Sequence, residues 1–140
     1  MEPGERCVVE IMRDEVVTLA PDEKLDLADD IMRLGRVRHM PVVEGKRLVG
    51  IVSARDLLAA SLTKSLEFDP GQRRTFLKSV EVSDVMTSDP LTAREDTTLI
   101  AAAELMVRRM IGCLPIVSAD GTLRGIITET DLIRAAYLSD

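Results

Sequence analysis

An internal repeat constrains the fold of this 140-residue sequence more than any other feature. Met12 corresponds to Met86 at a shift of 74 residues, and Gly50 corresponds to Gly125 at a shift of 75, since the second copy has one more residue in a turn. The register holds through helical and strand patterns alike, which chance similarity would not do. Because about fifty residues bury too little apolar surface to be stable alone, we expect the two copies to pack together around an approximate two-fold axis.

Each copy has the pattern of the element order β-α-β-β-α. In the first copy a short apolar run at 16–20 predicts a strand, and Asp22 is the expected N-cap of the following helix. Two further strands flank a tight turn at Gly45, and a second helix is predicted to begin near Ala54. The second copy repeats this order from a short strand at 90–93 onward. The predicted fold class is α+β, with two β-α-β-β-α repeats packed about a pseudo-two-fold axis.

The repeat divides the chain into three parts. The first repeat occupies residues 1–60, and the second repeat occupies residues 83–140. Between them, residues 61–82 are predicted to form a linker that begins as an extension of the preceding helix. This linker breaks at the Asp-Pro-Gly sequence of residues 69–71 and continues through polar and basic residues, so it is the least constrained segment.

The charge and composition exclude several classes of function. A net charge of −6 and an aromatic content of 2% argue against nucleic-acid binding, which needs cationic surfaces and, for single strands, stacking side chains. No apolar run approaches the roughly 20 residues of a membrane-spanning helix. The first residues do not resemble a secretory signal, so we expect a cytoplasmic protein. The two cysteines, Cys7 and Cys113, predict no disulfide framework.

A hydroxyl followed three residues later by a carboxylate ends the last strand of each copy. The pairs are Ser53 with Asp56 and Thr128 with Asp131. One interpretation is a helix-capping box, in which each side chain accepts a hydrogen bond from the other residue's backbone N–H. The other is a nucleotide site, because a helix N-terminus and a hydroxyl suit a phosphate group and a carboxylate can accept both hydroxyls of a ribose. The residues alone leave both interpretations open.

In its ordered motifs the sequence resembles the CBS domain family, which takes its name from cystathionine β-synthase. Each motif alone is weak, whereas the ordered set, present twice over nearly the whole chain, is specific. The motifs are TLAPD (18–22), HMPVV (39–43) and GIVSARD (50–56), followed by TARED (92–96), CLPIV (113–117) and GIITETD (125–131). The resemblance implies a CBS pair of the stand-alone type, or Bateman module, with two symmetry-related clefts.

The resemblance also implies a ligand and its contacts. CBS pairs commonly bind AMP, ADP or ATP, and some members bind S-adenosylmethionine or NAD. By this likeness Asp56 and Asp131 would hold ribose hydroxyls, while Ser53 and Thr128 would meet the phosphate or the 5′ side of the ligand. The adenine pocket would be lined by Thr18, Met40 and Pro41 and, in the second copy, by Thr92, Leu114 and Pro115.

The two copies differ in their basic residues. Arg38, His39 and Arg55 of the first copy resemble residues that contact phosphate in nucleotide-binding members of the family. The second copy has Gly112 and Cys113 in place of Arg38 and His39. Because a guanidinium presents a planar fork of donors that matches phosphate, we predict one well-equipped phosphate site and one poorer site. Which cleft Arg38 and His39 serve stays open, since family clefts draw on both repeats.

The predicted role is regulation rather than catalysis. His39 is the single histidine, and neither a nucleophile elbow nor a P-loop occurs, so we expect no enzyme activity and no metal site. We expect a sensor that binds an adenosine nucleotide and signals its occupancy to an unidentified effector protein, with a homodimer as the usual assembly of the family. The alternatives are a scaffold module that binds no ligand and a sensor of S-adenosylmethionine or NAD.

Overall fold

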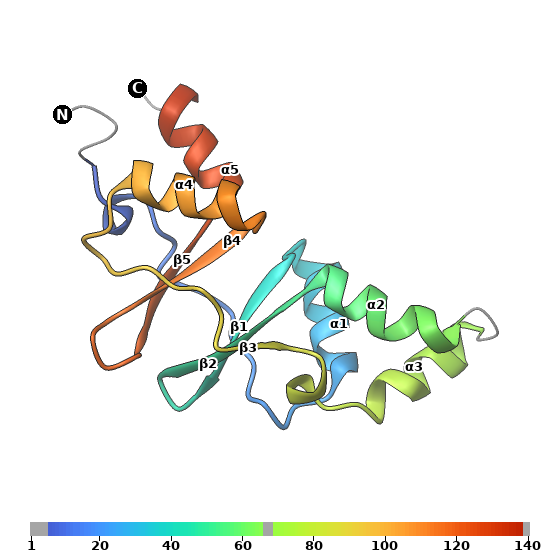
Figure 1. Ribbon diagram of the computed structural model, residues 1–140. Coiled ribbons are helices and arrows are strands. Elements are labelled where there is room, and N and C mark those ends of the chain that lie inside the picture. The colour runs from blue at the N-terminus through green and yellow to red at the C-terminus, as the bar shows by residue number, and fades with distance from the viewer. Residues whose placement is uncertain (1–5, 66–68, 139–140) are drawn as a thin grey trace. The chain divides into compact units, whose positions relative to one another are not determined.

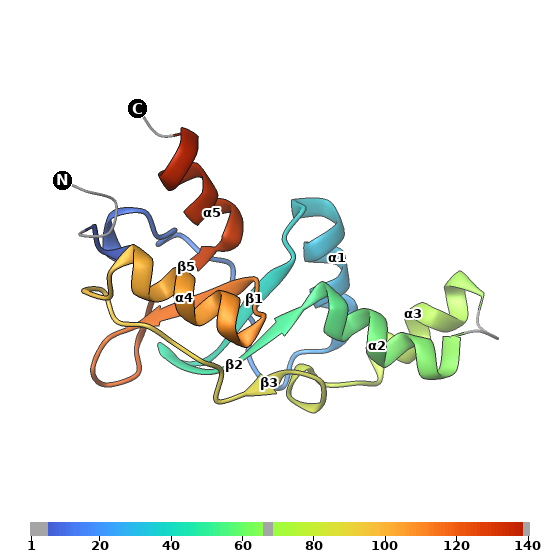
Figure 2. The same ribbon diagram turned by 45° about the horizontal axis from the view of Figure 1, so that its top comes forward.

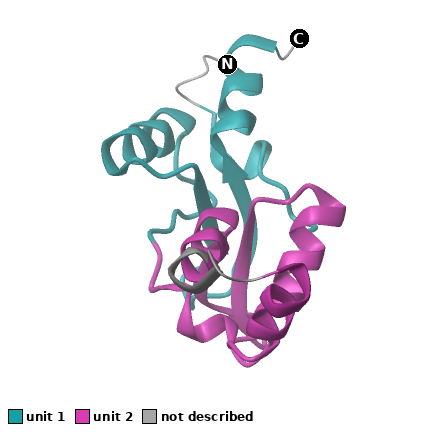
Figure 3. Cartoon of the chain, turned by 90° about the vertical axis from the view of Figure 1, so that its right-hand side faces the viewer, with its two compact units in different colours: residues 1–16, 91–140 teal, residues 17–90 magenta. Residues whose placement is uncertain are grey.

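In the computed structural model the described residues are 6–65 and 69–138 (Figure 1). The chain divides into two compact units (Figure 3). The terminal unit consists of Met1–Val16 with Leu91–Asp140, and the middle unit consists of Val17–Pro90. Each unit has its own sheet and its own hydrophobic core. Within the described ranges, no helix has the length and apolar character needed to cross a membrane.

The sheet of the middle unit has the strand order β1-β2-β3. Its strands are β1 (His39–Glu44), β2 (Arg47–Ser53) and β3 (Thr87–Ser88). Gly45 closes the β1–β2 turn as the sequence predicts, with a φ of +63° that glycine adopts without steric cost. The helices are α1 (Leu25–Gly35), α2 (Ala54–Ser65) and α3 (Pro70–Lys78), and α2 and α3 lie side by side (Figure 2).

The core of the middle unit joins the hairpin to all three helices. Its buried members are Leu19, Leu25, Ala28, Met32, Met40, Val42, Val52, Leu57, Leu77 and Val82. Leu77 of α3 is 1% exposed, so α3 packs on this core although its sequence is polar and basic. Two ion pairs also hold α3 against α1, with Arg73 3.2 Å from Asp29 and Arg74 2.9 Å from Asp30.

The terminal unit is built on a two-stranded sheet. Its elements are α4 (Leu99–Arg109), β4 (Cys113–Val117), β5 (Leu123–Thr128) and α5 (Glu129–Ile133), which continues as a π-helical turn (Arg134–Leu138). Gly121 lies in the β4–β5 turn with a φ of +86°, as the hairpin pattern predicts. Its core consists of Val8, Ala93, Leu99, Ala102, Met106, Leu114, Ile116 and Ile127. Because Val8 is fully buried there, the segment around Val8 is part of this unit.

In each unit, a short segment of one repeat packs on the second hairpin strand of the other repeat. We call these the lead-in segments (residues 8–14 and 82–88). Arg13 and Ile126 exchange two backbone hydrogen bonds of 2.9 Å, so the first lead-in segment lies on β5. The second lead-in segment includes β3, which pairs with β2 through Gly50 opposite Ser88. Each compact unit therefore contains most of one repeat together with the lead-in segment of the other repeat.

The repeated glycine of the second hairpin strand makes room for the lead-in segment. A Cβ atom on Gly125 would lie 2.7 Å from the carbonyl oxygen of Arg13 and 2.8 Å from the sulfur of Met12. A Cβ atom on Gly50 would lie 3.0 Å from the carbonyl oxygen of Thr87. Glycine in a strand often marks such a close approach of another backbone, which accounts for this position in both copies.

The predicted first strand of each repeat is reduced to a single pair. Leu19 forms an isolated parallel bridge with Val42, and Ala93 forms the equivalent bridge with Ile116. Each bridge still aligns the chain with the first strand of the hairpin, because the backbone of the bridging residue bonds to that strand on both sides. The element order of the prediction is therefore kept, but with shorter strands.

The prediction that Asp22 caps the first helix is wrong. The α1 helix begins at Leu25, and the residue at its N-cap is Lys24, which makes no side-chain cap hydrogen bond. Lys24 forms an antiparallel bridge with Glu81 and is extended, with a ψ of 155°. This pairing holds the backbone out of the helical conformation until residue 25.

Candidate functional site

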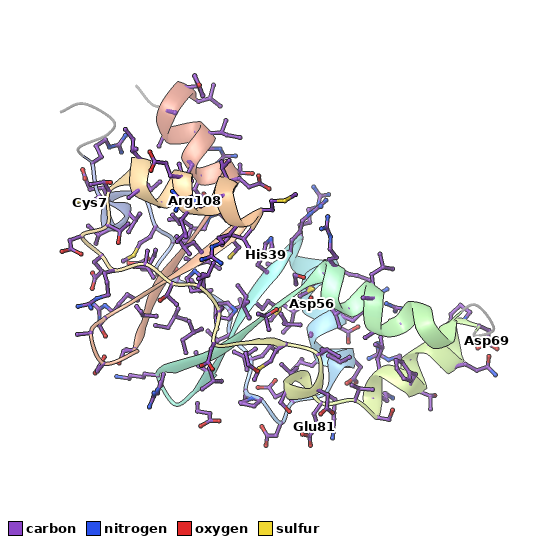
Figure 4. The ribbon with its side chains drawn as sticks, in the orientation of Figure 1. Cys7, His39, Asp56, Asp69, Glu81 and Arg108 are labelled. Carbon is purple, nitrogen blue, oxygen red and sulfur yellow. The ribbon has the colours of Figure 1, made fainter. Side chains whose placement is uncertain are left out.

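One end of the β1–β2 hairpin gathers the predicted site residues of the middle unit. His39 at the start of β1 is paired with Ser53 at the end of β2. The backbone N–H of Ala54 donates to the carbonyl oxygen of Arg38 at 2.9 Å, which joins the start of α2 to the strand. Figure 4 labels His39 and Asp56 at this end. The hairpin register therefore brings Arg38, His39, Ser53 and the first turn of α2 together.

Ser53 and Asp56 form the capping box that the sequence allowed. The Ser53 N–H donates to Asp56 Oδ2 at 2.8 Å, and the Asp56 N–H donates to Ser53 Oγ at 3.1 Å. Among the described residues Asp56 forms no ion pair, and Oδ1 accepts no hydrogen bond. Since an ionised carboxylate has about four lone-pair sites, capping leaves acceptor capacity for a ligand. The two interpretations of the motif are thus compatible.

The remaining predicted residues of the middle unit separate into surface and core positions. Arg38 and Arg55 are exposed, and His39 is half-buried. Thr18 is exposed. It lies beside β1, because the N–H of the next residue donates to the Pro41 carbonyl oxygen at 3.0 Å. Met40 has no exposed surface and belongs to the core, so its side chain supports the hairpin from within the unit.

The terminal unit repeats this arrangement at the end of the β4–β5 hairpin. Cys113 is paired with Thr128, and the Glu129 N–H donates to the Gly112 carbonyl oxygen at 3.1 Å. Thr128 donates its backbone N–H to Asp131 Oδ2 at 2.9 Å and its hydroxyl to the same oxygen at 3.0 Å. Asp131 Oδ2 is therefore occupied twice, whereas the corresponding Asp56 oxygen accepts one bond.

Asp131 also has an ionic partner that sequence reasoning missed. Arg13 Nε lies 3.4 Å and Nη2 lies 3.3 Å from Asp131 Oδ1. The Arg13 side chain is 60% exposed and the Asp131 side chain is 10% exposed. Comparison of the two copies could have drawn attention to Arg13, because it corresponds to the uncharged Thr87. The sequence did not predict that this arginine would contact the acid of the other repeat.

A surface hollow of about 500 Å³ adjoins the Asp131 carboxylate. Its lining residues are Arg6, Ile11, Asp131, Arg134, Ala135 and Leu138. Two guanidinium groups and three apolar side chains therefore surround one acid. The repeat pattern did not single out Arg6 or Arg134, because the corresponding residues, Val80 and Ala59, are uncharged and belong to no matching motif.

The other predicted residues of the terminal unit are Thr92, Leu114 and Pro115. Thr92 is exposed, while Leu114 and Pro115 are buried. Cys113 is also buried, and desolvation, with a smaller effect of the Asp131 charge, raises the pKa of its thiol to about 12. A thiol with this pKa stays protonated at neutral pH, so Cys113 acts as a small core residue rather than a nucleophile.

Each unit thus brings together a hydroxyl, a carboxylate and the start of a hairpin strand from one repeat. The chemistry available is acceptance of hydroxyl hydrogen bonds by the carboxylate, with guanidinium groups nearby as donors to an anion. Within residues 6–65 and 69–138, no three His, Cys, Asp or Glu side chains converge in a way that could hold a metal ion.

Comparison with known proteins matches this arrangement to one family. The model of the CBS domain matches residues 8–63 and 82–138. The CBS-pair protein CBSX2 from Arabidopsis thaliana is 31% identical, with a TM-score of 0.75 and 95% of each chain covered. A structure of CBSX2 in complex with AMP is 33% identical, with a TM-score of 0.78, and the match covers 95% of this chain and 97% of that one.

The relatives found by sequence include a protein of similar length to this chain and enzymes that are much longer. A CBS domain-containing protein of Dictyostelium discoideum is 30% identical over 127 residues, which are 90% of this chain and 88% of that protein. Inosine-5′-monophosphate dehydrogenase of Korarchaeum cryptofilum is 34% identical over 122 residues, which are 87% of this chain and 22% of the enzyme. The chain spans 22 to 44% of the length of the first relatives that it matches.

Proposed function

Since this chain belongs to the CBS domain family, we propose that it is a regulatory module that binds an adenosine nucleotide and signals its occupancy to a partner protein. AMP, ADP and ATP are the proposed ligands. The observation that supports the proposal is the Asp56 carboxylate, which caps α2 with Oδ2 while Oδ1 accepts no hydrogen bond from the described residues. The complex of CBSX2 with AMP, at 33% identity over nearly the full length of both chains, supports the choice of ligand class.

The proposed contacts divide the ligand between its sugar, phosphate and base. The carboxylates of Asp56 and Asp131 accept the ribose hydroxyls. Arg38, His39 and Arg55 meet the phosphate, since guanidinium groups at a helix start suit an anion. The base lies near Thr18 and Thr92, while the buried residues Met40, Pro41, Leu114 and Pro115 hold the hairpins that shape its pocket.

The module is proposed to be regulatory and to catalyse no reaction itself. Inosine-5′-monophosphate dehydrogenase and homoserine O-acetyltransferase are among the relatives, and this chain matches 22% and 23% of their lengths. A match to less than a quarter of an enzyme fits a part that controls the enzyme better than a part that performs its chemistry. The proposed compartment is the cytoplasm.

The proposed assembly is a homodimer formed through helices. Three large apolar side chains of the α4 region are exposed: Ile100 at 53%, Val107 at 78% and Met110 at 91%. Exposed apolar surface of this kind favours association when it is contiguous, and Ile100 and Val107 lie on one side of α4, with Met110 directly after its last residue. Sedimentation velocity of the wild type and of Val107→Glu tests the assembly, with a shift of the variant to monomer as the expected result.

A thermal-shift panel tests the ligand. The wild type is heated with AMP, ADP, ATP, S-adenosylmethionine and NADH, and a ligand at one hundred times its Kd adds about 2.7 kcal/mol of stability. Asp56→Asn and Asp131→Asn keep an oxygen for the cap but lose the charge and an acceptor, so one of them is expected to abolish the shift. Gln72→Ala is the matched control, because Gln72 holds the same position in the exposed capping box of α3.

Each outcome of this panel decides between the alternatives. If no compound stabilises the wild type, the module is a scaffold without a ligand. If only S-adenosylmethionine or NADH stabilises it, the ligand class proposed here is wrong. If both aspartate variants respond as the wild type does, the ribose assignment is wrong although the module binds a nucleotide.

A further inference from the structure

The two ribose-binding carboxylates differ because the exchanged lead-in segments differ. The first lead-in segment places Arg13 on Asp131, with both Nε and Nη2 directed at Oδ1. The second lead-in segment carries Thr87 at the corresponding position, and Asp56 has no ionic partner among the described residues. Hydroxyl groups that approach Asp131 must therefore compete with a guanidinium, whereas those that approach Asp56 do not.

The contact between Arg13 and Asp131 is arranged so that it can be exchanged. The backbone of Arg13 is fixed by its two hydrogen bonds of 2.9 Å to Ile126. Its side chain is 60% exposed, and its two contacts with Asp131 are long, at 3.3 and 3.4 Å. A partly exposed ion pair of this length contributes little stability, so moving the guanidinium away costs little while the backbone keeps it close to the site.

The surroundings of Asp131 favour an anion. Arg6 and Arg134 line the adjoining hollow with the Asp131 carboxylate, and neither forms an ion pair within the described part of the chain. With Arg13, three guanidinium groups stand near one carboxylate. When ribose hydroxyls take the carboxylate, the released Arg13 gains nothing from an uncharged nucleoside, but it can donate two hydrogen bonds to a phosphate.

We propose that Arg13 selects ligands by charge at the Asp131 site. In the free protein its guanidinium occupies Asp131 Oδ1. In the complex the ribose hydroxyls take that oxygen, and the guanidinium turns to the phosphate of the same ligand. The site then admits nucleoside phosphates and discriminates against adenosine. This inference rests on the proposed function, and it assigns to one lead-in residue the preference for a phosphorylated ligand.

Isothermal titration of adenosine and of AMP tests the proposal. The proteins are the wild type, Arg13→Gln, Arg13→Lys and Asp131→Asn. Arg124→Gln is the control, since Arg124 is an arginine of similar exposure, at 51%, that forms an ion pair with Glu95 in the same unit. The relevant site is the one whose binding is lost in Asp131→Asn. There, Arg13→Gln is expected to weaken the binding of AMP about tenfold, which corresponds to the loss of one charged hydrogen bond. The binding of adenosine should not be weakened. Arg13→Lys should give an intermediate AMP affinity, because lysine keeps the charge but not the fork.

The possible failures are distinct. If the wild type binds neither compound, this inference fails, and the proposed function fails with it only if ADP and ATP also give no shift in the thermal-shift panel. If AMP binding is lost in Asp56→Asn but unchanged in Asp131→Asn, the proposed function stands and the role of Arg13 is refuted. Equal weakening of adenosine and AMP by Arg13→Gln, or no change in either, also refutes selection by charge. A change with Arg124→Gln equal to that with Arg13→Gln would show a general effect of surface charge instead.

Discussion

Substitution of Gly125 by alanine tests the packing of the first lead-in segment. The new Cβ would lie 2.7 Å from the Arg13 carbonyl oxygen and 2.8 Å from the Met12 sulfur. The sulfur can move, but the carbonyl oxygen accepts the Ile126 N–H at 2.9 Å and cannot withdraw without weakening that bond. Overpacking of this kind costs about 1–3 kcal/mol, and a backbone hydrogen bond contributes about 1 kcal/mol, so we expect Gly125→Ala to destabilise by about 2 kcal/mol.

Two other glycines provide the comparison. At Gly35 the nearest atom to a new Cβ is Val37 Cγ2 at 3.4 Å, and φ is not positive, so Gly35→Ala should be neutral or stabilising by about 0.4–1 kcal/mol. Gly50→Ala should be intermediate, because its clash is with the flexible Met86 side chain and with the Thr87 carbonyl oxygen at 3.0 Å. The expected order of destabilisation is Gly125, then Gly50, then Gly35.

Urea unfolding followed by far-ultraviolet circular dichroism measures these differences. This probe is preferred because the chain has no tryptophan and a single tyrosine. The free energy of unfolding comes from the midpoint and slope of each transition. If Gly125→Ala unfolds at the same urea concentration as Gly35→Ala, the close approach of the lead-in segment to β5 does not constrain this strand, and the explanation of the repeated glycine is wrong.

Two further predictions concern titratable groups. Because burial and the Asp131 charge raise the Cys113 pKa to about 12, a thiol reagent at pH 8 should label the Cys7→Ser variant only as fast as the protein unfolds, and labelling at the rate of a free thiol would contradict this. The hydrogen bond from Arg74 lowers the pKa of Asp30 from 3.8 to about 2, so the stabilisation from this pair is complete above the unfolded value and is lost as the pH falls through about 2. Thermal unfolding between pH 5 and pH 2 should therefore lose part of its pH dependence in Asp30→Asn, and identical pH profiles for variant and wild type would argue against the pair.

The sequence predicted the hairpins well because their signals are local. Gly45 and Gly121 occupy turn positions with positive φ, and this requirement comes from the turn and not from any distant contact. The capping boxes were also predictable, since Ser53 and Asp56 interact within one helical turn. Repetition strengthened both predictions, because each local signal occurs a second time with the same spacing.

The start of α1 was mispredicted because it depends on a distant partner. Asp22 is a good capping residue by type, yet the bridge between Lys24 and Glu81 keeps the chain extended until Leu25. Those two residues are 57 positions apart in the sequence. Propensity describes what a segment prefers in isolation, and here a tertiary contact overrides it.

The candidate site was predictable in its carboxylates but not in its charges. Asp56 and Asp131 follow from a short motif, whereas the partner of Asp131 comes from residue 13, 118 positions away. A repeat shows which residues correspond to each other, but it does not show which residues meet in space. The exchange of the lead-in segments is what turns Arg13 toward the acid of the other repeat.

The two candidate sites therefore differ in the ionic partner of their carboxylates. The better phosphate site expected from Arg38, His39 and Arg55 remains a prediction, and the cleft that Arg38 and His39 serve remains open. Around Asp131, however, three arginines are present: Arg6, Arg13 and Arg134. Within the described part of the chain Asp131 has an ionic partner and Asp56 has none, so on the proposal above a ligand would displace a guanidinium only from Asp131. If Arg13 acts as proposed, the duplicated motif gives one site whose carboxylate has no ionic partner among the described residues and one site that prefers a phosphorylated ligand, through a single arginine in place of a threonine.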